Sequence, residues 1–242
     1  LSLAVATPIT GEEIRFTNSS WEFSISTLFE RMSLESLVVL NDFVAQALAL
    51  PHLHASACLP VGGTVPGLDD SQRHARAVLG PGTGLGVAGL IPDGNGWLAL
   101  PSEAGHMTLA GDDEPSRALV DQLATMARGH VAAEDVLSGP GLLRLYRALC
   151  AREGATATLR TPAEVSRAGT ADTACDPLAR ETLACFLGFL GAFAGDVALA
   201  FGAQGGIYLG GGIMPRLRPL LGASTFRERF EAKGRFRPYV AA

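Results

Sequence analysis

The chain has 242 residues and a formal net charge of −5, and 48% of its residues are hydrophobic and 18% charged. This composition excludes a disordered chain, and the length allows one large or two modest domains with a sizeable core. The acidic balance argues against a nucleic-acid partner. The four cysteines are scattered singly, which argues against a zinc knuckle and a disulfide framework.

The first element that the pattern indicates is a short buried strand at residues 36–40, which ends at Asn41-Asp42. Helical spacing follows over residues 43–50 and stops at Pro51. A carboxylate at the end of a strand lies where ligands bind in α/β sheets, so Asp42 is a candidate site residue. Taken by itself, Asp42 is better explained as the cap of the helix that follows it.

Residues 52–75 are rich in glycine and proline and predict a loop and a domain boundary. Three strands are then predicted, at residues 75–79, 87–91 and 97–100, with a hairpin turn between the last two. The first two strands are joined through four glycines that alternate with other residues around Thr83: Gly80, Gly82, Gly84 and Gly86.

This alternation of glycines predicts a turn with several exposed backbone N–H groups, and the Thr83 hydroxyl adds a donor. Such a nest suits an anionic phosphate, although an ordinary tight hairpin explains the pattern equally well. Gly84 to Gly89 also match the dinucleotide pattern G-x-G-x-x-G. That pattern needs a helix after it, and here a strand and a hairpin follow, so we reject a dinucleotide-binding fold.

The second half of the chain is predicted to be mainly helical. Pro115, Ser138 and Asp176-Pro177 each open a helix, and a further helix begins at Pro215. A strand at residues 206–209 precedes that last helix. Strands mixed with helices and hairpins predict an α/β fold with a mixed sheet.

The helix opened by Asp176-Pro177 contains a stretch, Leu183 to Ala203, that is long enough to span a bilayer and carries Asp196 as its single charge. Glycines recur along it at helical spacing, at Gly188, Gly191 and Gly195. Such a strip allows close approach of another backbone, so we expect a central core helix and no membrane association.

A second glycine cluster, Gly210, Gly211 and Gly212, follows the predicted strand at residues 206–209. Bare backbone at a strand-to-helix turn can receive a flat group such as a nucleoside, and close packing against the glycine-rich helix is the alternative. The Gly-Lys-Ser/Thr signature is absent from the sequence, which excludes a P-loop enzyme.

Several polar residues follow the predicted strands, and each alone is better explained as a solvated or capping group. They are Asn41, Glu103, His106 and Glu134. Together they suit a polyhydroxylated sugar, whose hydroxyls both donate and accept hydrogen bonds. His52 and His54 lack a third ligand nearby in the sequence, so no metal site is assigned to them.

Seven segments, in order and covering essentially the whole chain, resemble the bacterial glucokinases. They are Pro8-Ile9-Thr10-Gly11, Thr17-Asn18-Ser19-Ser20-Trp21, Leu40-Asn41-Asp42-Phe43, Gly80 to Gly86, Leu100-Pro101-Ser102-Glu103-Ala104-Gly105-His106, Glu134 to Gly141 and Gly210 to Arg216. Seven ordered motifs are far more specific than any one glycine pattern.

The resemblance implies an actin-like ATPase (ribonuclease H-like) fold of two domains, with residues 1–52 as the remainder of a small α/β domain and residues 53–242 as the large α/β domain. It implies a cytoplasmic enzyme that transfers the γ-phosphoryl group of ATP, with Mg²⁺, to O6 of glucose, and homodimerisation is a further family expectation. By position, Asp42 is the general base, and glucose contacts Asn41, Asp42, Glu103, His106 and Glu134. The phosphates contact Gly82, Thr83 and Gly84, and the adenosine faces Gly210, Gly211 and Gly212.

The chain also departs from the family pattern. The N-terminal Asp-x-Gly-Gly-Thr-Asn-x-Arg loop and the C-terminal segment are absent from the sequence, so we interpret the chain as a fragment with an incomplete small domain that is inactive alone. Ser102 and Ala104 replace family glycines. Two alternatives stay open, a kinase for another hexose such as mannose or an N-acetylhexosamine, and a non-catalytic sugar-binding repressor of the related ROK group.

Overall fold

The computed structural model describes residues 1–16, 19–62, 73–127, 129–171 and 175–241. Thr17 and Asn18 of the second family segment, residues 63–72 of the predicted boundary loop and Arg128 lie outside the described residues.

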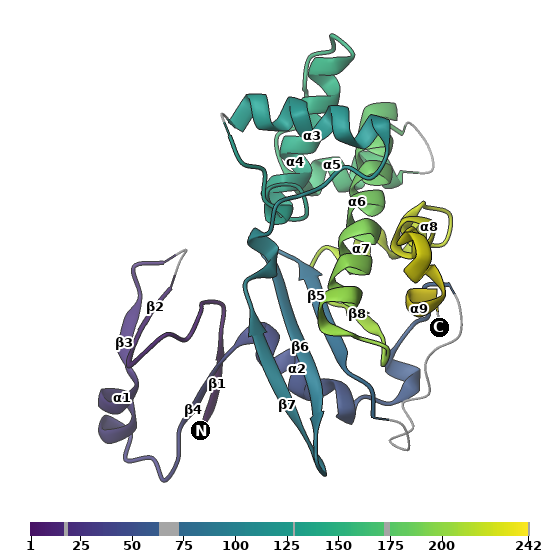
Figure 1. Ribbon diagram of the computed structural model, residues 1–242. Helices are drawn as coiled ribbons and strands as arrows, with labels where there is room; N and C mark the ends of the chain where they lie inside the picture. Colours follow the sequence, from purple (N-terminus) through teal and green to yellow (C-terminus); the bar gives the residue numbers. More distant parts are fainter. Residues whose placement is uncertain (17–18, 63–72, 128, 172–174, 242) are drawn as a thin grey trace.

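Figure 1 shows three parts along the chain: a small unit with the N-terminus, a central sheet, and helices stacked above and beside that sheet. The strands are β1 Ser2–Val5, β2 Glu13–Arg15, β3 Glu22–Ser24, β4 Val38–Asn41, β5 Arg76–Pro81, β6 Leu85–Asp93, β7 Gly96–Ser102 and β8 Ile207–Leu209. The α-helices are α1 Ile25–Arg31, α2 Asp42–Ala49, α3 Glu114–Ala127, α4 Gly139–Arg152, α5 Pro162–Thr170, α6 Pro177–Phe201, α7 Met214–Leu221, α8 Phe226–Glu231 and α9 Arg237–Ala241. Short 3₁₀ turns are η1 Leu50–His52, η2 Ala55–Ala57, η3 Ala104–His106, η4 Ala133–Asp135 and η5 Gly234–Phe236.

The central sheet has the strand order β7-β6-β5-β8. β5 pairs with β6 antiparallel and with β8 parallel, and β6 pairs with β7 antiparallel. The predicted α/β fold with a mixed sheet is therefore confirmed.

Strand β5 is buried along its whole length, and its alternate residues point to different partners. Ala77 and Leu79 belong to the large core that contains α6, whereas Val78 belongs to a second cluster around Phe43 and Ala47 of α2. The sheet is thus covered by α6 on one face and by α2 on the other. This arrangement fixes the N-terminus of α2, which carries Asp42, to the sheet.

The small unit consists of a parallel pair, β1 with β4, and an antiparallel pair, β2 with β3, next to α1. β4 leads directly into α2, which packs mainly on β5, β6 and β7. α2 therefore joins the small unit to the central sheet. The domain limits at residues 52 and 53 stay a prediction.

The long helix α6 is apolar and long enough to cross a membrane, but 72% of its most apolar window is buried inside the protein. Its glycine strip receives α8. A Cβ at Gly191 would overlap the backbone of Phe226, and one at Gly195 would overlap the backbone of Phe230. Lys233, just after α8, donates to the Ala192 carbonyl at 2.8 Å. The prediction of a core helix that admits another backbone is confirmed.

Candidate active site

Asn41 and Asp42 lie at the junction of β4 and α2, and the structure separates their roles. Asn41 is the N-cap of α2, because its Oδ1 accepts from the backbone N–H groups of Phe43 at 2.9 Å and Val44 at 3.3 Å. Asp42 is the first helical residue, and its Oδ1 accepts from the Phe43 N–H at 3.0 Å. Among the described residues, Asp42 Oδ2 has no hydrogen-bond partner. Asn41 is therefore the main cap of α2, and Oδ2 of Asp42 stays available for a ligand.

Glycines at the end of β5 and the start of β6 lie against neighbouring segments of the chain. A Cβ at Gly80 would stand 2.6 Å from the Gly210 carbonyl carbon, and one at Gly86 would overlap the ring of Phe43. The turn itself is tight, since the Gly82 N–H donates to the Gly84 carbonyl at 2.8 Å. Gly80 and Gly86 thus lie against neighbouring segments, which a hairpin alone does not require.

Glu134, in the turn η4, reaches this glycine turn. Its Oε2 accepts from the backbone N–H of Leu85 at 2.7 Å, and its carboxylate fills the place where a Cβ at Gly84 would stand. The neighbouring helix α4 also begins here, because the Gly139 N–H donates to the Gly82 carbonyl at 2.8 Å. One predicted sugar ligand and the predicted phosphate turn are therefore in direct contact.

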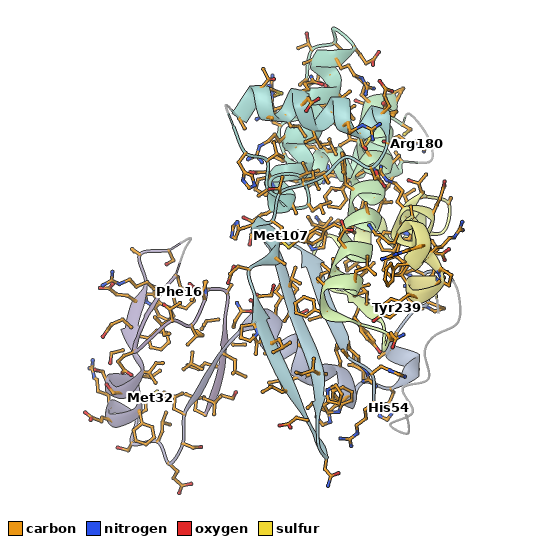
Figure 2. All side chains as sticks on the ribbon, viewed as in Figure 1. Phe16, Met32, His54, Met107, Arg180 and Tyr239 are labelled. Carbon is orange, nitrogen blue, oxygen red and sulfur yellow. The ribbon has the colours of Figure 1, made fainter. Side chains whose placement is uncertain are left out.

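The turn η3 follows β7. Glu103 precedes this turn, and His106 is its last residue. The His106 Nε2 and Glu103 Oε2 atoms are 4.0 Å apart, and both side chains are 63% exposed. η3 packs against η4, and a Cβ at Gly105 would overlap the Leu85 carbonyl. These contacts bring the three predicted sugar ligands of this part of the chain to the same end of the sheet, with exposed polar groups. Figure 2 shows Met107, the next residue, where the central sheet meets the upper helices.

The loop of Gly210, Gly211 and Gly212 lies beside the end of β5. The Gly210 N–H donates to the Leu79 carbonyl at 2.8 Å, and Gly211 has a φ of +85°, which favours glycine. A Cβ at Gly210 would stand 2.8 Å from Oε1 of Gln46, one turn along α2 from Asp42. α2 thus connects the predicted base to this second glycine loop.

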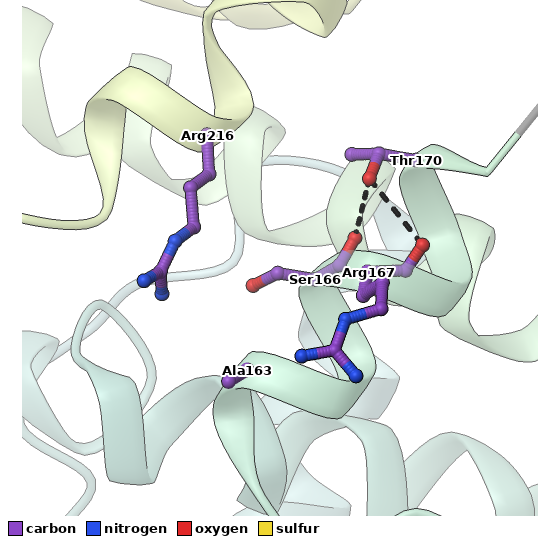
Figure 3. A pocket seen from close by; sticks show the side chains of 5 residues that line it. All are labelled: Ala163, Ser166, Arg167, Thr170 and Arg216. Atoms are coloured by element: carbon purple, nitrogen blue, oxygen red, sulfur yellow. Dashed lines mark hydrogen bonds between the residues drawn. The ribbon is translucent and has the colours of Figure 1, made fainter.

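A cavity of about 370 Å³ lies between α5 and α7. Its lining is Ala163, Ser166, Arg167, Thr170 and Arg216. Figure 3 shows the guanidinium groups of Arg167 and Arg216 on either side of this space. α7 begins directly after the Gly210–Gly212 loop, and Pro162 of α5 stands 3.8 Å from where a Cβ at Gly139 would be. The two helices that line the cavity are therefore connected to the two predicted nucleotide loops, α7 by the chain and α5 through Gly139.

The described residues contain no group of three or more His, Cys, Asp or Glu side chains that could hold a metal ion. Mg²⁺ commonly binds one or two carboxylates together with substrate phosphates and water. The donor set here, with Oδ2 of Asp42 not engaged by the described residues, suits a metal that enters with a phosphate ligand.

The structure thus brings the predicted site residues to one end of the central sheet, through contacts that the sequence did not reveal. Four features were not anticipated: the Leu85 N–H that holds Glu134, the Phe43 ring on Gly86, Gln46 beside Gly210, and the groove between α5 and α7. The start of α5, one wall of the groove, did have a signal in the sequence, because Thr161 and Glu164 form a capping box.

Comparison with known proteins gives consistent matches. The Glucokinase family description matches residues 1–242. The glucokinase of Paramagnetospirillum magneticum is 45% identical over all of this chain, which spans 73% of that relative. A crystal structure of a glucokinase from an Antarctic psychrotroph is 38% identical with a TM-score of 0.87, over 99% of this chain and 72% of that one. The glucokinase of Balamuthia mandrillaris, solved in complex with glucose, has a TM-score of 0.80 at 22% identity, over 99% of this chain and 71% of that one.

Proposed function

The chain belongs to the glucokinase family and has its actin-like ATPase fold, and from this premise we propose that it supplies the site for transfer of the γ-phosphoryl group of ATP to O6 of glucose. The observation that carries the proposal is the contact between Glu134 and the Gly82–Gly84 turn. This contact puts a proposed sugar-binding residue next to the turn proposed to bind phosphate. The family implies ATP as the donor.

Asp42 is the proposed general base. Its Oδ1 is held by the Phe43 N–H, and its second oxygen takes the proton of the sugar 6-hydroxyl as that oxygen attacks the γ-phosphorus. The bond from the γ-phosphorus to the bridging oxygen breaks, and ADP leaves with that oxygen. Phosphoryl transfer depends mostly on positioning and charge stabilisation, so one carboxylate with a fixed orientation suffices for the proton.

Substrate binding is assigned to the residues gathered at the same end of the sheet. Asn41, Glu103, His106 and Glu134 offer amide, carboxylate and imidazole groups to the sugar hydroxyls. Gly82, Thr83 and Gly84 are proposed for the phosphates, and Gly210, Gly211 and Gly212 for the adenosine, which extends into the groove between α5 and α7. Mg²⁺ enters as the ATP complex and neutralises phosphate charge. We place the enzyme in the cytoplasm.

The test is a coupled assay of the full-length gene product that carries this sequence, with ATP as donor and several hexoses as acceptors. Glucose should give glucose 6-phosphate, which glucose-6-phosphate dehydrogenase detects, and 6-deoxyglucose should give no phosphoester. Faster turnover of mannose or N-acetylglucosamine would assign the enzyme to another hexose. Binding of glucose without release of ADP would favour the sugar-responsive repressor.

The same assay on the isolated 242 residues tests the expectation that they are inactive alone. Glucose-dependent release of ADP by this chain would contradict that expectation.

A further inference from the structure

Gly82 and Gly84 stand in the same turn but face different surroundings. At Gly82, the described part of the chain places no atom within 4 Å of an added Cβ. At Gly84, an added Cβ would overlap the carboxylate of Glu134. Neither glycine has a positive φ, so the backbone of both positions accepts alanine. The two glycines therefore differ in what a methyl group would displace.

The carboxylate at Gly84 is held in place by the next residue. Leu85 is buried, and its N–H donates to Glu134 Oε2 at 2.7 Å. The carbonyl of Leu85 faces Gly105, in the turn that presents Glu103 and His106. One backbone unit is thus clamped between the two turns that carry the proposed sugar ligands.

This arrangement leaves the two oxygens of Glu134 with different tasks. Oε2 is engaged by the Leu85 N–H, and the described residues provide no hydrogen-bond partner for Oε1. Because the Leu85 N–H fixes Oε2, the orientation of the whole carboxylate, including Oε1, is fixed as well. Less conformational entropy is then lost when Oε1 binds a sugar hydroxyl.

On the basis of the function proposed above, we propose that Gly84 and Leu85 are positioning residues for Glu134. Gly84 provides the space for the carboxylate, Leu85 fixes its orientation, and Gly82 is the glycine that leaves room for the phosphates. Gly84 thereby serves sugar binding through Glu134, and this role replaces the assignment of Gly84 to the phosphates made above.

The experiment compares Gly84→Ala with Gly82→Ala in the full-length gene product. Glucose Kd and MgADP Kd are measured separately by titration calorimetry, each in the absence of the other ligand. Gly84→Ala should raise the glucose Kd about tenfold or more, as expected for the loss of a hydrogen bond to a charged group, and change the MgADP Kd by less than about twofold. Gly82→Ala should raise the MgADP Kd and leave the glucose Kd close to that of the wild type. Gly222→Ala is the matched control, since Gly222 also has open space around it and a φ of −66°.

A Gly84→Ala variant that weakens MgADP alone, or both ligands equally, would overturn the assignment. Wild-type protein that binds neither glucose nor MgADP would instead contradict the proposed function, so the two failures are distinguishable.

A double-mutant cycle with Glu134→Ala covers the case in which Gly84→Ala unfolds the protein. Without the carboxylate, the alanine methyl has room, so the double variant should unfold at the same urea concentration as Glu134→Ala alone. A double variant less stable than Glu134→Ala would show that Gly84 acts on something other than Glu134.

Discussion

The ring of Phe43 occupies the place where a side chain at Gly86 would stand. Phe43 is the residue after Asp42, and Gly86 is the second residue of β6. The contact therefore ties the first turn of α2 to the strand that leaves the glycine turn. Any residue larger than glycine at position 86 must displace the Phe43 ring, which is next to the proposed base.

Gly86→Ala should lower the free energy of unfolding by about 1–3 kcal/mol, because overpacking forces side-chain and backbone shifts. Urea unfolding measures the change, with Gly222→Ala as the control that should be near neutral. In a Phe43→Ala background the same substitution should cost much less. An equal cost in both backgrounds would show that Phe43 is not what excludes the methyl group.

Asp42→Asn should reduce kcat about 100-fold or more, because the amide cannot accept the proton of the sugar hydroxyl. The Asn side chain keeps an oxygen for the Phe43 N–H, so the helix end and the glucose Kd should stay close to those of the wild type. Steady-state kinetics and glucose titration measure the two effects. Asp121→Asn, on the exposed side of α3, is the matched control. A variant with nearly normal turnover would exclude Asp42 as the base.

Asn41 combines a structural and a proposed ligand role, and two substitutions separate them. Asn41→Ala removes the cap of α2 and should lower the free energy of unfolding by about 1 kcal/mol. Asn41→Ser keeps a capping oxygen, so its stability should approach that of the wild type. Both variants lack the amide and should raise the glucose Kd by roughly 3- to 10-fold. A serine variant with unchanged glucose affinity would remove Asn41 from the sugar site.

The sequence predicted the elements around the site well, because their patterns are local. The strand before Asn41, the helix after it, the hairpin of β6 and β7 and the cap at Ser138 all depend on residues within a few positions of each other. No strand is predicted at the apolar residues 1–6, although Ser2–Val5 form β1. Its partner β4 lies more than thirty residues away, and such pairing leaves little local signal.

The contacts that unite the candidate site could not be predicted in the same way. The Leu85 N–H and Glu134 are 49 positions apart, and a backbone donor has no residue type by which a pattern could reveal it. The glycines of the turn suggested phosphate binding, whereas three of the four lie against Gly210, Glu134 or Phe43. A glycine marks a close approach but does not identify what approaches.

Asp113 offers a pH-dependent test of a helix start that lies away from the site. Hydrogen bonding by the side chain and the backbone N–H of Ser116 holds the pKa of Asp113 below its usual value, and the Ser116 N–H donates to Asp113 Oδ1 at 2.8 Å. Because the folded-state pKa is depressed, the stabilisation is fully present above the unfolded pKa of about 3.9 and is lost as pH falls through the folded value.

Asp113→Asn keeps a capping oxygen but does not titrate in this range. Wild type should therefore be more stable than Asp113→Asn at pH 7, and urea unfolding from pH 7 to pH 3 should show this difference shrinking below about pH 4. Ser116→Ala removes the hydroxyl and should reduce the same pH-dependent part of the free energy of unfolding. A difference that stays constant down to pH 3 would show that the charge of Asp113 does not stabilise the start of α3.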